Sequence, residues 1–242
     1  MTRLKLDKFK VPITLFFFLL FFLVYPFIPK HTGDDLLQMA VSVIFIIIPS
    51  LSMFVKSPKR LLAASALALL SLVLLVVAVV THDFLMMNFV IISEFFFFLF
   101  TFIIVVNHIF SCENVSVHQV LSSILGYFLI AFLFAFIYAF ASLYHTDILT
   151  FTYTAPGLSL HPAGAYWNFS DTLYFSMVTL TSLGYGDLVP VLHHVRMLAA
   201  LEAVVGQMYL AVFVARLVGL MISQNVTRKE DKILREIKEI EV

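Results

Sequence analysis

Six long apolar runs dominate this 242-residue chain and restrict what it can fold into. A helix that crosses the hydrocarbon core of a bilayer needs about 20 apolar residues. Charged residues make up 12% of the chain, against about 25% in soluble domains. One soluble core cannot bury all the runs, so we expect an all-α membrane protein with six transmembrane helices. The runs cover residues 11–29, 36–55, 61–80, 84–106, 119–144 and 197–222.

The basic residues predict how the chain crosses the membrane. They gather before the first run, between the second and third, and after the sixth, whereas the opposite side has only Lys30 and Arg196. By the positive-inside rule both termini lie in the cytoplasm, and we expect the plasma (cell inner) membrane. The lipid bilayer is an expected partner. The net charge of zero gives no reason to expect a nucleic-acid partner.

A polar stretch with two glycines interrupts the apolar pattern between the fifth and sixth runs. It follows a short apolar helix predicted over 170–181, whose Ser170 and Asp171 are typical of helix N-caps. This helix is too short to span a bilayer and suits a re-entrant segment. Irregular backbone at that depth requires burial in protein or a water-filled path. Gly184 and Gly186 can take positive φ, and alternating handedness would turn successive carbonyls to one side.

The stretch TLTSLGYGD, residues 179–187, resembles the selectivity filter of potassium channels, usually written T-V-G-Y-G-D. The surrounding residues 169–190 are also similar to prokaryotic channels of the ion-transport type. The resemblance implies a tetrameric pore made of four copies of the chain, a homotetramer, with K⁺ as the permeant ion and no other cofactor. By this match K⁺ is bound by the carbonyls of Ser182, Leu183, Gly184 and Tyr185 and by the Ser182 hydroxyl, and Gly186 completes the filter.

Two filter positions depart from the family pattern. Ser182 replaces the usual threonine and Leu183 the usual valine, which leaves the degree of K⁺ over Na⁺ selectivity open. We expect the selectivity itself to survive, because the carbonyls do the coordinating. Thr181, Asp187 and Tyr174 are expected to support the filter, with Asp187 accepting a hydrogen bond from Tyr174.

The sixth run is expected to contribute the cavity and the gate. Gly206 follows the filter at about the distance at which related channels have a hinge glycine. The alternative is a glycine that only lets helices pack closely. Both interpretations stay open. The residues expected to face the cavity are Gln207, Leu210 and Val214.

Several polar residues lie in or near the predicted spans. Glu94 is either a neutral structural glutamate or a proton or ligand sensor, and Glu202 is expected to support the pore from behind. Arg216 is expected to extend its side chain to the membrane interface, with a gating ion pair as the alternative. His193 and His194 lie near the outer mouth, either as solvated loop residues or as sensors of external acid.

The chain divides into three predicted parts. Residues 1–110 form a four-helix transmembrane domain that resembles a voltage sensor, 111–223 a pore domain, and 224–242 a short cytoplasmic amphipathic helix. No lysine or arginine lies between Arg60 and Arg196, so the first domain carries no gating charges. The pore domain is expected to contain an outer helix at 119–144, a turret at 145–168, a pore helix at 170–181, a filter at 182–187 and an inner helix at 192–223.

The resemblance favours a potassium-selective channel that conducts passively and is not gated by an arginine-based voltage sensor. Two alternatives stay open, a weakly selective monovalent cation channel and a non-conducting membrane scaffold or accessory subunit. The sequence offers no nucleophile–base pair or metal-ligand group for an enzyme, and we expect none. It also gives no basis for inferring an accessory subunit.

Overall fold

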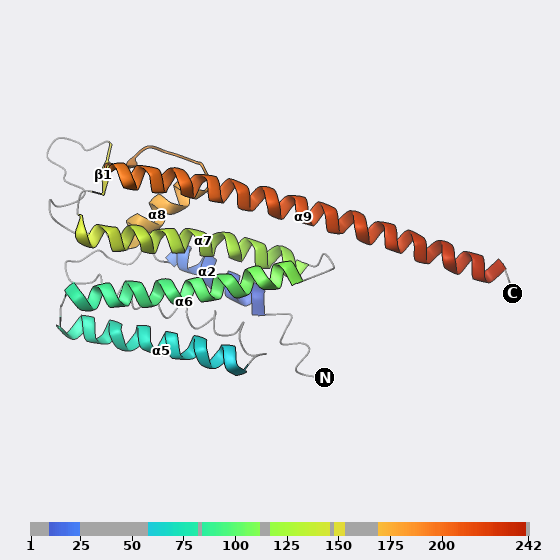
Figure 1. The fold of residues 1–242 in the computed structure, drawn as a ribbon, viewed down its shortest axis with the longest axis horizontal. Helices are drawn as coiled ribbons and strands as arrows, with labels where there is room; N and C mark the ends of the chain where they lie inside the picture. Colours follow the sequence, from blue (N-terminus) through green and yellow to red (C-terminus); the bar gives the residue numbers. More distant parts are fainter. Residues whose placement is uncertain are drawn as a thin grey trace.

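Long helices lying side by side form most of the structure, a computed structural model that describes residues 10–24, 58–81, 84–111, 117–145, 148–152 and 169–240. This part of the chain contains six helices and two short strands. In Figure 1, α9, α7, α6 and α5 lie one below another, with α8 between α9 and α7. The elements are α2 (Lys10–Val24), α5 (Pro58–Thr81), α6 (Phe84–Ser111), α7 (Val117–Tyr144), β1 (Leu149–Phe151), α8 (Phe169–Leu180), β2 (Leu188–Pro190) and α9 (His193–Ile240).

Four of the described helices are long and apolar enough to cross a membrane, by length and composition. They correspond to the third to sixth predicted runs. The first predicted run is present as the shorter helix α2. The second, 36–55, lies outside the described residues, as does most of the predicted turret, 145–168. The membrane-length segments are Lys59–Ala78, Leu85–Phe110, Val117–Tyr144 and His193–Val226.

Local chemistry accounts for the helices. Within lipid, backbone N–H and C=O groups must bond to one another, which favours helix over irregular chain. Pro58 is the first residue of α5, where the missing N–H of proline removes no intrahelical bond. Polar side chains inside the apolar helices bond to their own backbone, as where Thr101 Oγ1 donates to the Phe97 carbonyl at 2.9 Å.

The last helix, α9, differs from its prediction. It is one helix of 48 residues, whereas the sequence predicted a separate helix at 224–242. After Gly219 the chain contains no glycine or proline that would end the helix. Opposite charges four residues apart in the tail also favour helix. Figure 1 shows the result, a rod that extends well beyond the other helices.

Phenylalanine side chains hold α2, α6, α7 and α8 together. The rings of Phe98 and Phe132 stack with centroids 5.2 Å apart and an interplanar angle of 8°. Phe18 meets Phe132 edge-on at 5.3 Å, and Phe169, the first residue of α8, stacks on Phe136 at 4.7 Å. Because lipid tails are as apolar as these rings, close packing is what favours helix association in a membrane. This packing fixes the start of α8 against α7.

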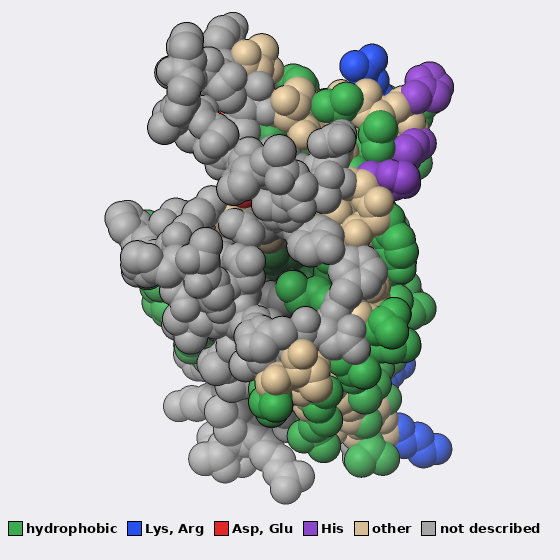
Figure 2. Space-filling view, turned by 90° about the vertical axis from the view of Figure 1, so that its left-hand side faces the viewer, with side chains coloured by type: hydrophobic (Ala, Val, Ile, Leu, Met, Phe, Trp, Pro, Cys, Tyr) green, Lys and Arg blue, Asp and Glu red, His purple; other side chains and the backbone are tan. Residues whose placement is uncertain are grey.

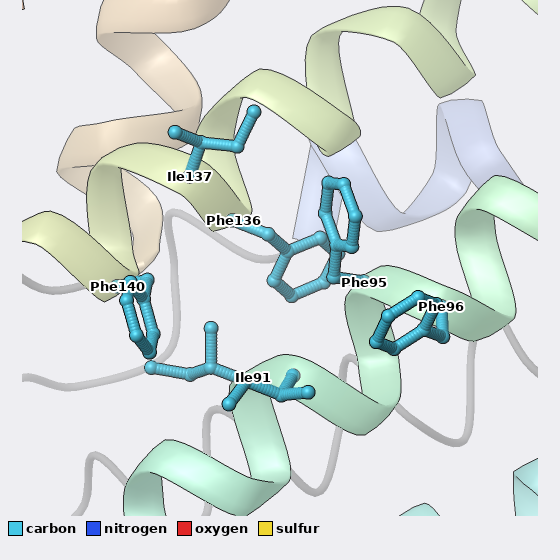
Figure 3. Close-up of a pocket in the computed structure, with 7 residues that line it drawn as sticks. Ile91, Phe95, Phe96, Phe136, Ile137 and Phe140 are labelled. Atoms are coloured by element: carbon cyan, nitrogen blue, oxygen red, sulfur yellow. The ribbon is translucent and has the colours of Figure 1, made fainter.

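An apolar pocket opens between α6 and α7 (Figure 3). Phe95 and Phe96 reach it from α6, and Phe140 reaches it from α7. The adjacent Phe97 and Phe98 are buried, whereas Phe96 is 54% exposed. The phenylalanine run of α6 therefore contributes both to the core and to the outer surface.

A small sheet pairs part of the predicted turret with the chain between the predicted filter and the predicted inner helix. Strands β1 and β2 pair antiparallel, with Leu149 opposite Pro190 and Phe151 opposite Leu188. Each strand has three residues, too few for a periodic signal, and their pairing is a tertiary contact. The predicted all-α class did not include this two-stranded sheet. It holds the chain that follows α7 against the chain that precedes α9.

Candidate functional site

The short helix α8 ends deep in the bundle and leads into an irregular stretch, residues 181–187, called here the 181–187 segment. Helix α8 has 12 residues, which gives a length of about 18 Å. The hydrocarbon core of a bilayer is about 30 Å thick, so α8 is too short to cross it. Tyr127, near the middle of α7, donates its hydroxyl to the Leu180 carbonyl at 2.9 Å. The 181–187 segment therefore begins about halfway along α7, next to the negative end of the α8 dipole.

The backbone of the 181–187 segment alternates in handedness. Ser182, Gly184 and Gly186 have φ values of 57°, 59° and 75°. Ser182 is the only non-glycine residue in the described part of the chain with positive φ. An alternation of this kind turns successive carbonyls toward the same side. The sequence predicted it at the two glycines but not at Ser182, where a side chain costs about 1–2 kcal/mol.

The amides of this segment bond back toward α8. The amides of Leu183 and Gly184 both donate to the Val178 carbonyl, at 3.0 and 3.4 Å, and the Ser182 amide donates to the Thr179 carbonyl at 3.0 Å. No hydrogen-bond donor in the described residues reaches the carbonyls of 182–185. The segment thus presents a strip of carbonyl oxygens that can accept a hydrogen bond or bind a cation.

Side chains and strands secure the far end of the segment. Thr152, after β1, donates its hydroxyl to the Gly186 carbonyl at 2.6 Å and its amide to the Asp187 carbonyl at 2.8 Å. The Tyr174 hydroxyl donates to Asp187 Oδ2 at 2.6 Å, which confirms the predicted contact, although its role in function stays a prediction. Thr181 bonds within its own turn, donating to the Met177 carbonyl at 2.7 Å.

A buried carboxyl ties α9 to the back of α8. Glu202 is fully buried and accepts a hydrogen bond from the Tyr138 hydroxyl at 2.7 Å. The Ser176 hydroxyl of α8 bonds to Glu202 Oε1 and reaches the Ala131 carbonyl of α7 at 2.8 Å. The sequence placed Glu202 behind the site but missed Tyr138 and Ser176. Their signal was a hydroxyl within an apolar helix, a weak one because such hydroxyls commonly bond to their own backbone.

Gly206 lies where α9 comes closest to the end of α8. A Cβ atom there would overlap the Leu180 carbonyl oxygen and lie 2.9 Å from Leu180 Cδ1. Helix α9 continues through this residue without interruption. The contact supports the packing interpretation of Gly206, and the hinge interpretation stays a prediction.

The three residues predicted to face a cavity follow Gly206 on α9. Gln207, Leu210 and Val214 are all exposed in the single chain, and their spacing of three and four places them on one helix face. Gln207 Nε2 donates a hydrogen bond to Ser182 Oγ at 2.9 Å. This face of α9 therefore continues directly from the 181–187 segment.

The other candidates lie apart from the segment. Glu94 is buried in α6, and its Oε1 has no hydrogen-bond partner among the described residues. The ring of His194 lies 6.0 Å from that of His145, and His193 is the preceding residue in the sequence. Figure 2 shows histidine side chains gathered at one edge of the molecule. Within the described residues, no group of three or more His, Cys, Asp or Glu side chains could hold a metal ion.

The Arg216 side chain bonds to the end of α6, and its predicted place at the membrane interface stays a prediction. Its guanidinium donates to the carbonyls of Ile109 at 3.0 Å and Phe110 at 2.8 Å, and lies 4.8 Å from the centroid of the Phe110 ring. These carbonyls are at the C-terminal end of α6, where they have no intrahelical donor. Arg216 therefore links α9 to α6.

Replacing Glu202 with leucine is expected to destabilise the protein more than replacing it with glutamine. Glutamine keeps an acceptor oxygen for Tyr138, whereas leucine leaves that buried hydroxyl without one, at a cost of about 1–3 kcal/mol. The midpoint of thermal unfolding of the detergent-purified protein measures the difference. Equal midpoints for Glu202→Leu and Glu202→Gln would show that the hydrogen bond contributes nothing.

Comparison with known proteins finds a similarity over part of the chain. Residues 130–223 match a protein-family model described as "Ion channel". The match begins in α7 and covers α8, the 181–187 segment, β2 and most of the apolar part of α9. No curated protein and no solved structure matches the chain. Together with the four helices of membrane-spanning length, this match indicates an integral membrane protein whose residues 130–223 are similar to ion channels.

Proposed function

We propose that this chain is a potassium-selective channel that conducts K⁺ passively. The observation that carries the proposal is the alternation of positive φ at Ser182, Gly184 and Gly186. This alternation turns the carbonyls of 182–185 toward one side, while the amides of Leu183 and Gly184 bond back to the Val178 carbonyl. In a K⁺ filter, carbonyl oxygens take the place of the water molecules around the ion, and selectivity depends on this exchange. On this account K⁺ lies against the carbonyls of 182–185.

One chain supplies one strip of carbonyls, so the proposed channel is a homotetramer around a common axis. Two features of the isolated chain support an assembly. Tyr185 is 66% exposed, although it lies in the middle of the candidate site. Only 11% of the membrane-length part of α9 is buried in the single chain, against 61% of that of α7. Neighbouring chains would cover these surfaces.

The proposed topology has six spans with both termini in the cytoplasm, as the positive-inside rule indicates. The sequence run 36–55, which lies outside the described residues, is the candidate for the second span. Helix α8 then enters from the outer side and directs the negative end of its dipole toward the middle of the membrane, which favours a cation there. His193 and His194 lie at the outer mouth. The proposed location is the plasma (cell inner) membrane.

Selectivity tests the proposal against its alternative, a weakly selective cation channel. In liposomes or planar bilayers, the full chain is expected to give a reversal potential close to the K⁺ equilibrium potential when Na⁺ is the opposing cation. A reversal potential midway between the K⁺ and Na⁺ equilibrium potentials would favour the alternative. The absence of any cation current would favour a non-conducting scaffold or accessory subunit.

Two glycine substitutions make the selectivity measurement specific for the 181–187 segment. At both Gly184 and Gly219 an added Cβ meets nothing within 4 Å in the chain, but Gly184 has a φ of 59° and Gly219 lies within a helix. Gly184→Ala is therefore strained by about 1–2 kcal/mol in each chain and is expected to lower K⁺ selectivity. Gly219→Ala is the control and should keep it. Preserved selectivity in Gly184→Ala would contradict the assignment.

Weak dependence on voltage is the second expectation. No lysine or arginine lies between Arg60 and Arg196, and each elementary charge that moves across the membrane contributes about 2.3 kcal/mol per 100 mV. Single-channel open probability should change only slightly between about −100 and +100 mV. Opening with an effective valence of several charges would contradict this expectation.

A further inference from the structure

Gln207, on α9, contacts the 181–187 segment through its side chain. Its Nε2 donates to Ser182 Oγ at 2.9 Å. No other hydrogen bond from the described residues reaches this hydroxyl. Both side chains are exposed in the single chain. In the proposed tetramer the pair would lie at the cytoplasmic end of the carbonyl strip, where the filter meets the cavity.

The preceding glycine accounts for the close approach of Gln207. Because Gly206 has no Cβ, α9 can approach the Leu180 carbonyl at the end of α8. Ser182 follows Leu180 by two residues, and Gln207 follows Gly206 directly. A glutamine at this place on α9 therefore has both the reach and the donor to bond to the serine hydroxyl.

The bond changes what the Ser182 hydroxyl can do. A serine hydroxyl has one proton to donate and two lone pairs that accept. The Gln207 amide occupies one lone pair and limits rotation of the hydroxyl, which leaves one lone pair for a cation. A ligand group already held in its bound orientation loses less conformational entropy on binding.

We propose that Gln207 is a positioning residue that sets cation affinity at the innermost filter site by orienting the Ser182 hydroxyl. This inference rests on the proposed function. Gln207 acts through Ser182, and the ligand that the pair recognises is a dehydrated cation of about the size of K⁺. The serine that replaces the usual filter threonine thus obtains, from an amide on α9, the restraint that the missing methyl group would otherwise give.

Block by Ba²⁺ tests the inference. Ba²⁺ is a divalent cation of nearly the radius of K⁺, and its second charge makes its binding sensitive to each oxygen ligand. The full chain is reconstituted in planar bilayers, and Ba²⁺ is added on the side of the α9 C-terminus. Gln207→Met keeps the length of the side chain but removes the donor. It is expected to raise about tenfold the concentration of Ba²⁺ that blocks half of the variant's own K⁺ current.

Three further variants separate this effect from a general change in α9. Ser182→Ala removes the acceptor, so adding Gln207→Met to it is expected to cause no further change in block. Leu201→Met introduces the same residue at a position of α9 that is 55% exposed, and it should leave block unchanged. If Gln207→Met does not assemble, Gln207→Asn, which keeps an amide too short to reach Ser182, is expected to weaken block in the same direction.

Each outcome separates the inference from the proposed function. If the wild-type chain carries K⁺ current and Gln207→Met shows the same Ba²⁺ block as the wild type, the inference is overturned and the channel proposal stands. An equal effect of Gln207→Met with and without Ser182→Ala also overturns it, because the effect would then not pass through the hydroxyl. A wild-type chain that carries no K⁺ current overturns the proposed function and this inference with it.

Discussion

The direction of the peptide groups after α8 is the constraint on which the rest of the structure depends. The Val178 carbonyl accepts the amides of Leu183 and Gly184, and no donor from the described residues reaches the carbonyls of 182–185. Carbonyls without partners at membrane depth carry a cost of several kcal/mol each. Residues 182–185 are exposed in the single chain, so water or a cation can bond to these carbonyls, and in our proposal that partner is K⁺.

The surrounding helices serve to hold these peptide groups in place. Tyr127 of α7 holds the end of α8 by a hydrogen bond, and Gly206 lets α9 pack closely against it. Glu202 joins both helices to α8 through hydroxyl groups, and Thr152 secures the other end of the segment. The contacts come from elements on three sides, so the geometry of the 181–187 segment does not rest on its own short backbone bonds. In our proposal these contacts hold the carbonyls in the arrangement that binds K⁺.

Reasoning from the sequence succeeded where one residue type has one physical consequence. The apolar runs predicted the helices from α5 onward, and the paired glycines indicated the alternation of backbone handedness. It failed where the outcome depends on contacts between distant residues. The positive φ of Ser182, the bond from Gln207 and the pairing of β1 with β2 all require α9 and the strands to be in place. The tail was predicted as a separate helix because its composition changes, although the backbone continues without a break.

The most direct test of the central claim is a map of the purified chain in K⁺ solution by electron cryomicroscopy. The account predicts four chains around one axis, with the carbonyls of 182–185 turned inward and density for ions between them. A map in which these carbonyls face away from any common axis, or in which the four segments do not meet, would contradict it.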